Sequence, residues 1–100
     1  MEKEILMLSD EKISELATDF KAISDEGRLK IIIYLLDGKR SVGEISTALN
    51  ISQSSTSHAL RILKDAKILR CEKSGNVIYY YVNDDHVRTI IEKSIEHLEC

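Results

Sequence analysis

The chain contains no proline and only four glycines in 100 residues, so few positions can interrupt a helix. Apolar residues recur at three- and four-residue intervals over most of its length, which is the period of an amphipathic helix. After Lys67 the period changes to a two-residue alternation, which is typical of strands. We therefore predict a mostly α-helical fold with a small β-hairpin near its end.

Helix caps and turn residues divide this pattern into elements in the order α-α-α-α-β-β-α. Helices are expected over residues 9–23, 26–37, 41–49 and 52–65, strands over 68–73 and 77–82, and a last helix from about residue 85 onward. Residues suited to cap these helices are Ser9 or Asp10, Ser41 with Glu44 as a capping box, Ser52, and Asn83 or Asp84. Asn50 is suited to end the third helix.

The apolar positions also predict which faces are buried. The helix over 26–37 is apolar on nearly all sides, so we expect it at the centre of the core. The inward residues expected from the next two helices are Val42, Ile45, Ala48 and Leu49, and then Ala59, Leu60, Ile62 and Leu63.

Length and composition indicate one small globular domain over residues 1–100, with 43% hydrophobic and 31% charged residues. Because a chain of this size has a thin core, a core shared with a second subunit is expected. No apolar run approaches the ~20 residues that cross a bilayer, and the first residues lack the basic flank of a signal peptide. We predict a cytoplasmic protein without membrane contact, in which Cys71 and Cys100 are free thiols or ligands.

The net charge of −3 conceals an uneven distribution along the chain. Residues 1–27 carry −5 and residues 74–100 carry −3, whereas 28–50 carry +2 and 51–73 carry +3. A basic centre can approach a phosphate backbone while the acidic ends lie elsewhere. The alternative is an ordinary solvated surface of mixed charge.

Residues 41–65 have the pattern of a helix-turn-helix, in which the second helix enters the major groove of DNA. The first turns of that second helix are unusually polar, and such side chains can reach base edges or phosphates. The expected DNA contacts on this helix are Gln53, Ser54, Ser57 and His58 in the groove and Arg61 and Lys64 on the backbone. Ser52 and Ser55, at the start of the helix, are also expected to contact DNA. Lys73, beside the hairpin turn, would touch a neighbouring phosphate or the minor groove, as the wing of a winged helix does.

Two other interpretations of this segment exist. The polar residues of the first turn also compete with the helical backbone for hydrogen bonds, so they can be a solvated helix start. A winged helix can also bind only protein, and steeply salt-dependent binding to duplex DNA would exclude that.

Side chains of metal-ligand type lie in and just before the last helix, at Asp84, His86, His97 and Cys100. At about 100° per residue the two histidines share one face, but roughly 16 Å of helix axis separates them. A shared zinc ion requires each nitrogen at about 2 Å. One helix therefore cannot place both histidines on one ion.

Two copies of the helix, packed antiparallel, would bring Asp84 and His86 of one copy to His97 and Cys100 of the other. Two-fold symmetry would then create two identical four-ligand sites at the interface of a homodimer formed through the first and last helices. This donor set suits zinc, with cobalt able to substitute, better than magnesium or calcium. An apolar stripe suited to such an interface is formed by Val87, Ile90, Ile91, Ile95 and Leu98. Alternatively, His86, His97 and Cys100 are only the polar rim of a dimer helix.

The chain resembles the ArsR/SmtB family of bacterial winged-helix repressors from about residue 11 to its end. The resemblance rests on Phe20-Lys21-Ala22-Ile23-Ser24-Asp25 with Arg28-Leu29, on segments 41–45 and 52–60, and on Asp84-x-His86-Val87 with His97 and Cys100. It is closest to the zinc- and cobalt-responsive branch. The resemblance implies a homodimer that binds an inverted-repeat operator without metal and is released by metal.

The chain departs from the family pattern at two places. Cys100 stands where better-known members have Glu or His, which leaves open a set of three ligands plus water and favours softer ions such as Cd(II). Segment 41–49 contains no cysteine, which argues against an arsenic sensor.

Two alternative functions compete with that of a metal sensor. A repressor of the same fold could respond to redox through Cys71 and Cys100, as sulfur-sensing relatives do, although nothing in the sequence brings these thiols together. A metal-dependent hydrolase would need an open coordination site and a substrate cleft, and the chain offers no obvious cleft. We therefore predict that the protein is not an enzyme.

Overall fold

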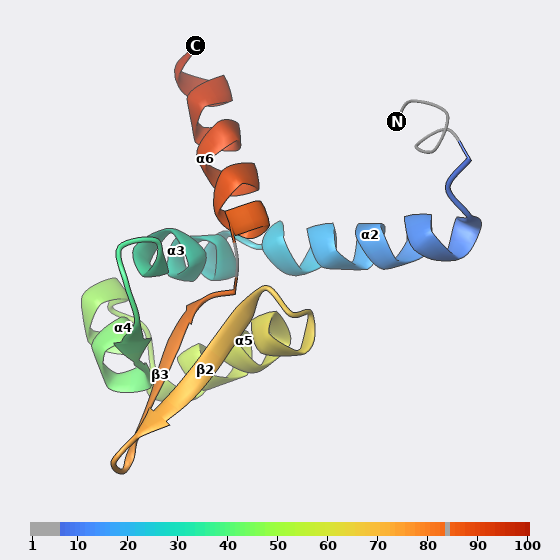
Figure 1. Ribbon diagram of the computed structural model, residues 1–100. Helices are drawn as coiled ribbons and strands as arrows, with labels where there is room; N and C mark the ends of the chain where they lie inside the picture. Colours follow the sequence, from blue (N-terminus) through green and yellow to red (C-terminus); the bar gives the residue numbers. More distant parts are fainter. Residues whose placement is uncertain (1–6, 84) are drawn as a thin grey trace.

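The computed structural model describes residues 7–83 and 85–100. These residues form five helices and three strands: α2 (Asp10–Ile23), α3 (Glu26–Leu35), β1 (Arg40–Ser41), α4 (Val42–Leu49), α5 (Gln53–Asp65), β2 (Leu69–Ser74), β3 (Val77–Val82) and α6 (Asp85–Glu99). Figure 1 shows α3, α4 and α5 gathered with the β2–β3 hairpin, whereas α6 and most of α2 project from this body. The predicted winged helix-turn-helix fold is confirmed, with one strand added to the expected order.

That added strand is β1, which pairs antiparallel with β3 to give the sheet order β1-β3-β2. It has only two residues, which is too short to produce an alternating pattern, so the sequence gives no signal of this strand. The hairpin forms where it was expected, but Ser74 pairs with Val77, so β2 runs from Leu69 to Ser74 and the turn consists only of Gly75 and Asn76. Gly75 has a φ of +64° at the hairpin tip, where the turn requires the left-handed region that glycine adopts without strain.

Helix α3 lies at the centre of the core, as its apolar surface predicts. Ile31, Ile32 and Leu35 are buried and pack with residues of α5, β2 and α6. The helix ends at Leu35 and not at residue 37, because Leu36 N–H donates to the Ile33 carbonyl at 3.2 Å and tightens the last turn.

One of the core positions predicted for α4 is wrong. Ile45 is buried, but Ala48 is exposed and Ser46 is buried instead. At about 100° per residue, Ser46 lies about 40° from Val42, on the side of Val42 opposite to Ile45, whereas Ala48 lies about 120° from Val42 and is turned away from the core. Ser46 is tolerated there because its hydroxyl donates to the Gly43 carbonyl at 3.1 Å.

The turn between α4 and α5 sets the angle of the helix-turn-helix. Asn50 ends α4 in the left-handed conformation, with a φ of 54°. Ser52 then caps α5, as predicted, by accepting a hydrogen bond from Ser55 N–H. Leu60 and Leu63 are buried and confirm the expected stripe. Thr56 is also fully buried, with its hydroxyl bonded to the Ser52 carbonyl at 2.8 Å.

The connection from α5 to β2 passes through Lys67, a lysine with a φ of 62°. Lys67 N–H bonds the Lys64 carbonyl and Ile68 N–H bonds the Leu63 carbonyl, which is the pair of bonds of a Schellman helix end. Asn83 holds the same turn from β3, because its side-chain amide donates to the Lys67 carbonyl at 2.8 Å. The turn is therefore fixed although glycine, which fits this conformation best, is absent.

Helices α2 and α6 are each joined to the body by a hydrogen bond near one end. Arg28 Nε donates to the Ala22 carbonyl at 2.7 Å and joins α2 to α3. Arg88 Nη2 donates to the Leu36 carbonyl at 2.8 Å and joins α6 to the end of α3. The radius of gyration is 15.0 Å. A 100-residue domain typically has about 13 Å, so the two helices extend the molecule.

A capping box fixes the start of α4. Ser41 Oγ accepts from Glu44 N–H at 3.2 Å, and Ser41 N–H donates to Glu44 Oε1 at 3.0 Å. The hydrogen bond from the Ser41 backbone lowers the pKa of Glu44 below its ordinary value of 4.5. The carboxylate therefore contributes stability above that value, and the contribution is lost as pH falls through the lowered pKa.

We expect Glu44→Ala to lower the melting temperature at neutral pH and to have progressively less effect as pH falls from about 6 to about 3. Thermal unfolding followed by circular dichroism measures the difference. Ser52→Ala serves as the control, because the first turn of α5 has no carboxylate and losing its serine cap costs about 1 kcal/mol at any pH. A Glu44→Ala deficit that is constant with pH would contradict the role of the ionised carboxylate.

Candidate DNA-binding and metal-binding site

One face of α5 carries most of the side chains predicted to contact DNA. These predicted contacts, together with Lys73 on β2, are all exposed: Ser52, Gln53, Ser54, Ser55, Ser57, His58, Arg61 and Lys64. The Ser52 hydroxyl is engaged as the cap of α5. The structure thus brings the α5 residues onto one solvent-facing surface, with Lys73 separate on the hairpin.

Helix α4 supports this surface from behind. Nε2 of Gln53 lies 4.0 Å from where a Cβ on Gly43 would stand, so the Gln53 amide is beside the first turn of α4. Thr56 does not belong to the surface because it points into the core.

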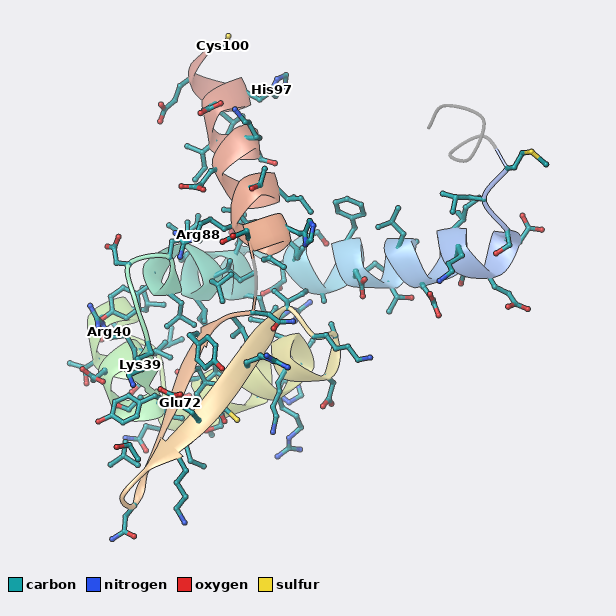
Figure 2. The ribbon with its side chains drawn as sticks, viewed as in Figure 1. Lys39, Arg40, Glu72, Arg88, His97 and Cys100 are labelled. Carbon is teal, nitrogen blue, oxygen red and sulfur yellow. The ribbon has the colours of Figure 1, made fainter. Side chains whose placement is uncertain are left out.

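The wing has ionic contacts that sequence reasoning missed. Lys39, just before β1, forms a salt bridge with Glu72 of β2 and lies 5.5 Å from the centre of the Tyr79 ring. The hydrogen bond to Glu72 raises the pKa of Lys39. Arg40 Nε donates to the Tyr34 hydroxyl at 3.3 Å. Figure 2 shows Lys39 and Glu72 in front of the sheet. No short-range pattern signals a pair 33 residues apart.

The predicted metal ligands lie at the two ends of α6. His86 is in the first turn, whereas His97 and Cys100 are at the far end, and all three are exposed. Figure 2 places His97 and Cys100 at the tip of the helix, away from the body. Asp84 lies outside the described residues. Within the described ranges, no three His, Cys, Asp or Glu side chains of one chain form a group that could hold a metal ion.

The two cysteines are both free, on elements that the fold keeps apart. Cys71 lies in β2, and Cys100 ends the chain beyond α6 at the opposite side of the molecule in Figure 1. One chain therefore does not bring the two thiols together.

A hollow of about 660 Å³ lies between α2 and α6. Apolar side chains including Leu16, Phe20, Val87 and Ile90 line it, and His86 stands at its wall. Leu16 is 50% and Phe20 49% exposed. Ile91 corrects one expectation, because it is buried in the core of its own chain and not presented to a partner.

Comparison with known proteins identifies the family. The profile described as "Bacterial regulatory protein, arsR family" matches residues 25–70, which span α3 to the start of β2. A cadmium resistance transcriptional regulatory protein CadC homolog from Staphylococcus aureus is 35% identical over 91 residues, covering 90% of this chain and 75% of that protein. The chain belongs to the ArsR family.

Other ArsR-type relatives agree with this assignment. A transcriptional repressor SmtB homolog from Synechocystis is 28% identical over 93% of this chain and 70% of that protein. The homodimeric winged helix-turn-helix DNA-binding domain of a possible ArsR-family regulator from Mycobacterium bovis superimposes with a TM-score of 0.84 at 25% identity, over 92% of this chain and 88% of that one. Reduced HlyU from Vibrio cholerae gives 0.79 at 31% identity, over 91% and 95% of the respective chains.

These relatives make the chain a DNA-binding transcriptional regulator of the ArsR/SmtB family, and not an enzyme. No helix in the part of the chain that the structure describes is long and apolar enough to cross a membrane.

Proposed function

We propose that this ArsR-family protein is a metal-responsive repressor whose metal-free homodimer binds an inverted-repeat operator in double-stranded DNA. Zn(II), or Co(II) or Cd(II) in its place, binds at the dimer interface and releases the protein from DNA. The observation that carries this proposal is the placement of exposed ligands at both ends of one projecting helix, too far apart to share an ion within a single chain.

The projecting helices support a homodimer formed through α2 and α6. Their exposed apolar residues are Ile13, Leu16, Phe20, Ile90 and Leu98. A monomer rarely leaves such a surface open to water, and the hollow between α2 and α6 offers a second copy a place to pack. A two-fold axis there would bring the first turn of one α6 to the last turn of the other.

The donor chemistry fits zinc. His97 and Cys100 are three residues apart at the end of α6, and His86 would offer a further imidazole from the partner. Imidazole nitrogen and thiolate sulfur, with a carboxylate from Asp84, form a tetrahedral set that zinc, cobalt or cadmium prefers to magnesium. The name of the Staphylococcus aureus relative, a cadmium resistance regulator, agrees with a metal of this kind.

The DNA-binding half of the proposal assigns roles along α5 and the wing. Ser52, Ser54 and Ser55 lie at the start of the helix, where backbone N–H groups favour phosphate. Gln53, Ser57 and His58 are proposed to reach base edges, and Arg61, Lys64 and Lys73 to contact the backbone.

The test begins with a duplex selected from a random pool by metal-free protein, whose binding is followed by fluorescence anisotropy. Adding Zn(II) is expected to weaken binding by about 5- to 150-fold, the usual range for coupling between two sites. By linkage, the duplex must weaken zinc binding by the same factor. Sedimentation equilibrium on the free protein is expected to show a dimer. A monomer, or a duplex affinity that zinc leaves unchanged, would contradict the proposal.

A further inference from the structure

Basic residues occur at every third position from α5 into the wing, at Arg61, Lys64, Lys67, Arg70 and Lys73. These residues lie in three kinds of backbone conformation: residues 61 and 64 are helical, residue 67 is in the left-handed turn, and residues 70 and 73 are in β2. A three-residue interval does not keep side chains on one face of a strand, so only the fold decides which of them meet.

The structure brings three of these cations to one concave surface. A groove of about 680 Å³ between the end of α5 and strand β2 is lined by Lys64, Lys67 and Arg70, with Cys71, Tyr81 and Asn83. None of the described residues that line it carries a carboxylate. Across residues 7–83 and 85–100, the side chains of the three cations form no ion pair or hydrogen bond.

Hydrogen bonds hold the backbone of the groove in place. The Asn83 side chain, just after β3, donates to the Lys67 carbonyl, and Arg70 is paired with Tyr81 in the sheet. Lys67 also keeps a left-handed conformation where glycine or asparagine would be less strained, and such outliers persist at functional positions more often than elsewhere. Like charges gathered on one surface, with no ion pair to them among the described residues, favour an anionic ligand.

We propose that this groove is a phosphate-binding site that takes a backbone phosphate of bound DNA. It lies between the exposed face of α5 and the wing, and Lys64 belongs to both α5 and the groove. When α5 occupies the major groove and the wing reaches the next minor groove, the strand between them passes this position. The inference rests on the DNA binding of the proposed function and is independent of its metal site.

The first test measures the salt dependence of binding to the selected duplex. Lys67→Asn removes a cation and keeps a residue that accepts the left-handed conformation, and Arg70→Gln removes one from the strand. Each is expected to weaken binding and to reduce the slope of log affinity against log salt by about 1. Lys12→Gln on the far part of α2 is the matched control and should leave the slope unchanged. Equal slopes for all variants would overturn the proposal.

The second test uses Cys71 as a reporter inside the groove. In metal-free Cys100→Ser protein it is the only thiol, so its alkylation by iodoacetamide reports access to the site. The duplex is expected to slow alkylation at least about tenfold, and the Lys67→Asn change to relieve part of that protection. The alkylation rate is also measured with inorganic phosphate at millimolar concentration in place of the duplex.

The outcomes of the two tests are distinguishable. Protection by free phosphate, with unchanged salt slopes, would overturn the assignment to DNA and make a small anion the ligand. Full affinity for the duplex without protection of Cys71 would exclude this groove and leave the proposed function intact. Absence of duplex binding by the unaltered protein would instead contradict the proposed function.

Discussion

Replacing Ile31 by alanine is expected to lower the free energy of unfolding by about 2–5 kcal/mol. Ile31 has no exposed surface and lies in the core that α3 shares with α5 and the sheet. The loss combines the transfer of the missing methyl and methylene groups with the cavity that they leave. Since the free energy of unfolding of a small domain is about 5–15 kcal/mol in total, the change removes a large part of the stability of the fold.

The neighbouring isoleucine supplies a control on the same helix. Ile33 is 41% exposed, two residues from a side chain of the same chemistry that is fully buried. Ile33→Ala changes helix propensity in the same way, so the difference between the two variants isolates burial. Urea unfolding at one fixed protein concentration measures both, because a dimer makes stability depend on concentration. Equal losses would contradict the packing of α3 described above.

Replacing His97 by alanine is expected to abolish the release of DNA by metal while the metal-free affinity for DNA stays unchanged. The side chain is exposed at the far end of α6, away from the recognition surface. Its loss removes a ligand from each proposed site, so the coupling of about 1–3 kcal/mol between metal and DNA should vanish. Cobalt titration gives an independent measurement, because tetrahedral Co(II) absorbs strongly in the visible region and the variant should lose these bands.

Two variants separate the roles in this experiment. His58→Ala, on the recognition face of α5, should weaken DNA binding and leave the cobalt bands unchanged. Cys100→Ser should remove only the thiolate charge-transfer band if the thiol is a ligand. Metal affinity should also fall as pH is lowered, because protons compete with the metal ion for the ligand atoms. A His97→Ala protein that still responds to zinc would exclude this residue from the site.

Arg88 provides a direct contact between the proposed sensor helix and the DNA-binding body. It lies in the first part of α6, two residues after His86, and its guanidinium bonds the carbonyl that ends α3. Figure 2 shows Arg88 over α3. An arginine in a helix gives no sequence signal of such a contact, because its acceptor is a main-chain carbonyl 52 residues earlier.

Local rules predicted the helix boundaries well where a side chain contacts its own neighbouring backbone. Ser9, Ser41 and Ser52 cap their helices because the acceptor and the N–H lie within three residues of each other. The prediction was wrong for Ala48, because it was assigned to the core for its hydrophobic side chain although its angular position on α4 faces away from the core. Ser46 is buried on the inward face, where its hydroxyl is satisfied by a hydrogen bond to a carbonyl three residues earlier.

The amino-acid order on its own determined the succession of helices and strands, their caps, the exposed polar face of α5 and the family of the protein, because each depends on residues close together in the chain or on a continuous motif. Tertiary structure alone decided the pairing of β1 with β3, the bond of Arg88 to α3, the burial of Ile91 within its own chain, and the meeting of Lys64, Lys67 and Arg70 in one groove. These contacts join segments whose separation is set by how the whole core packs, and no local propensity encodes that distance.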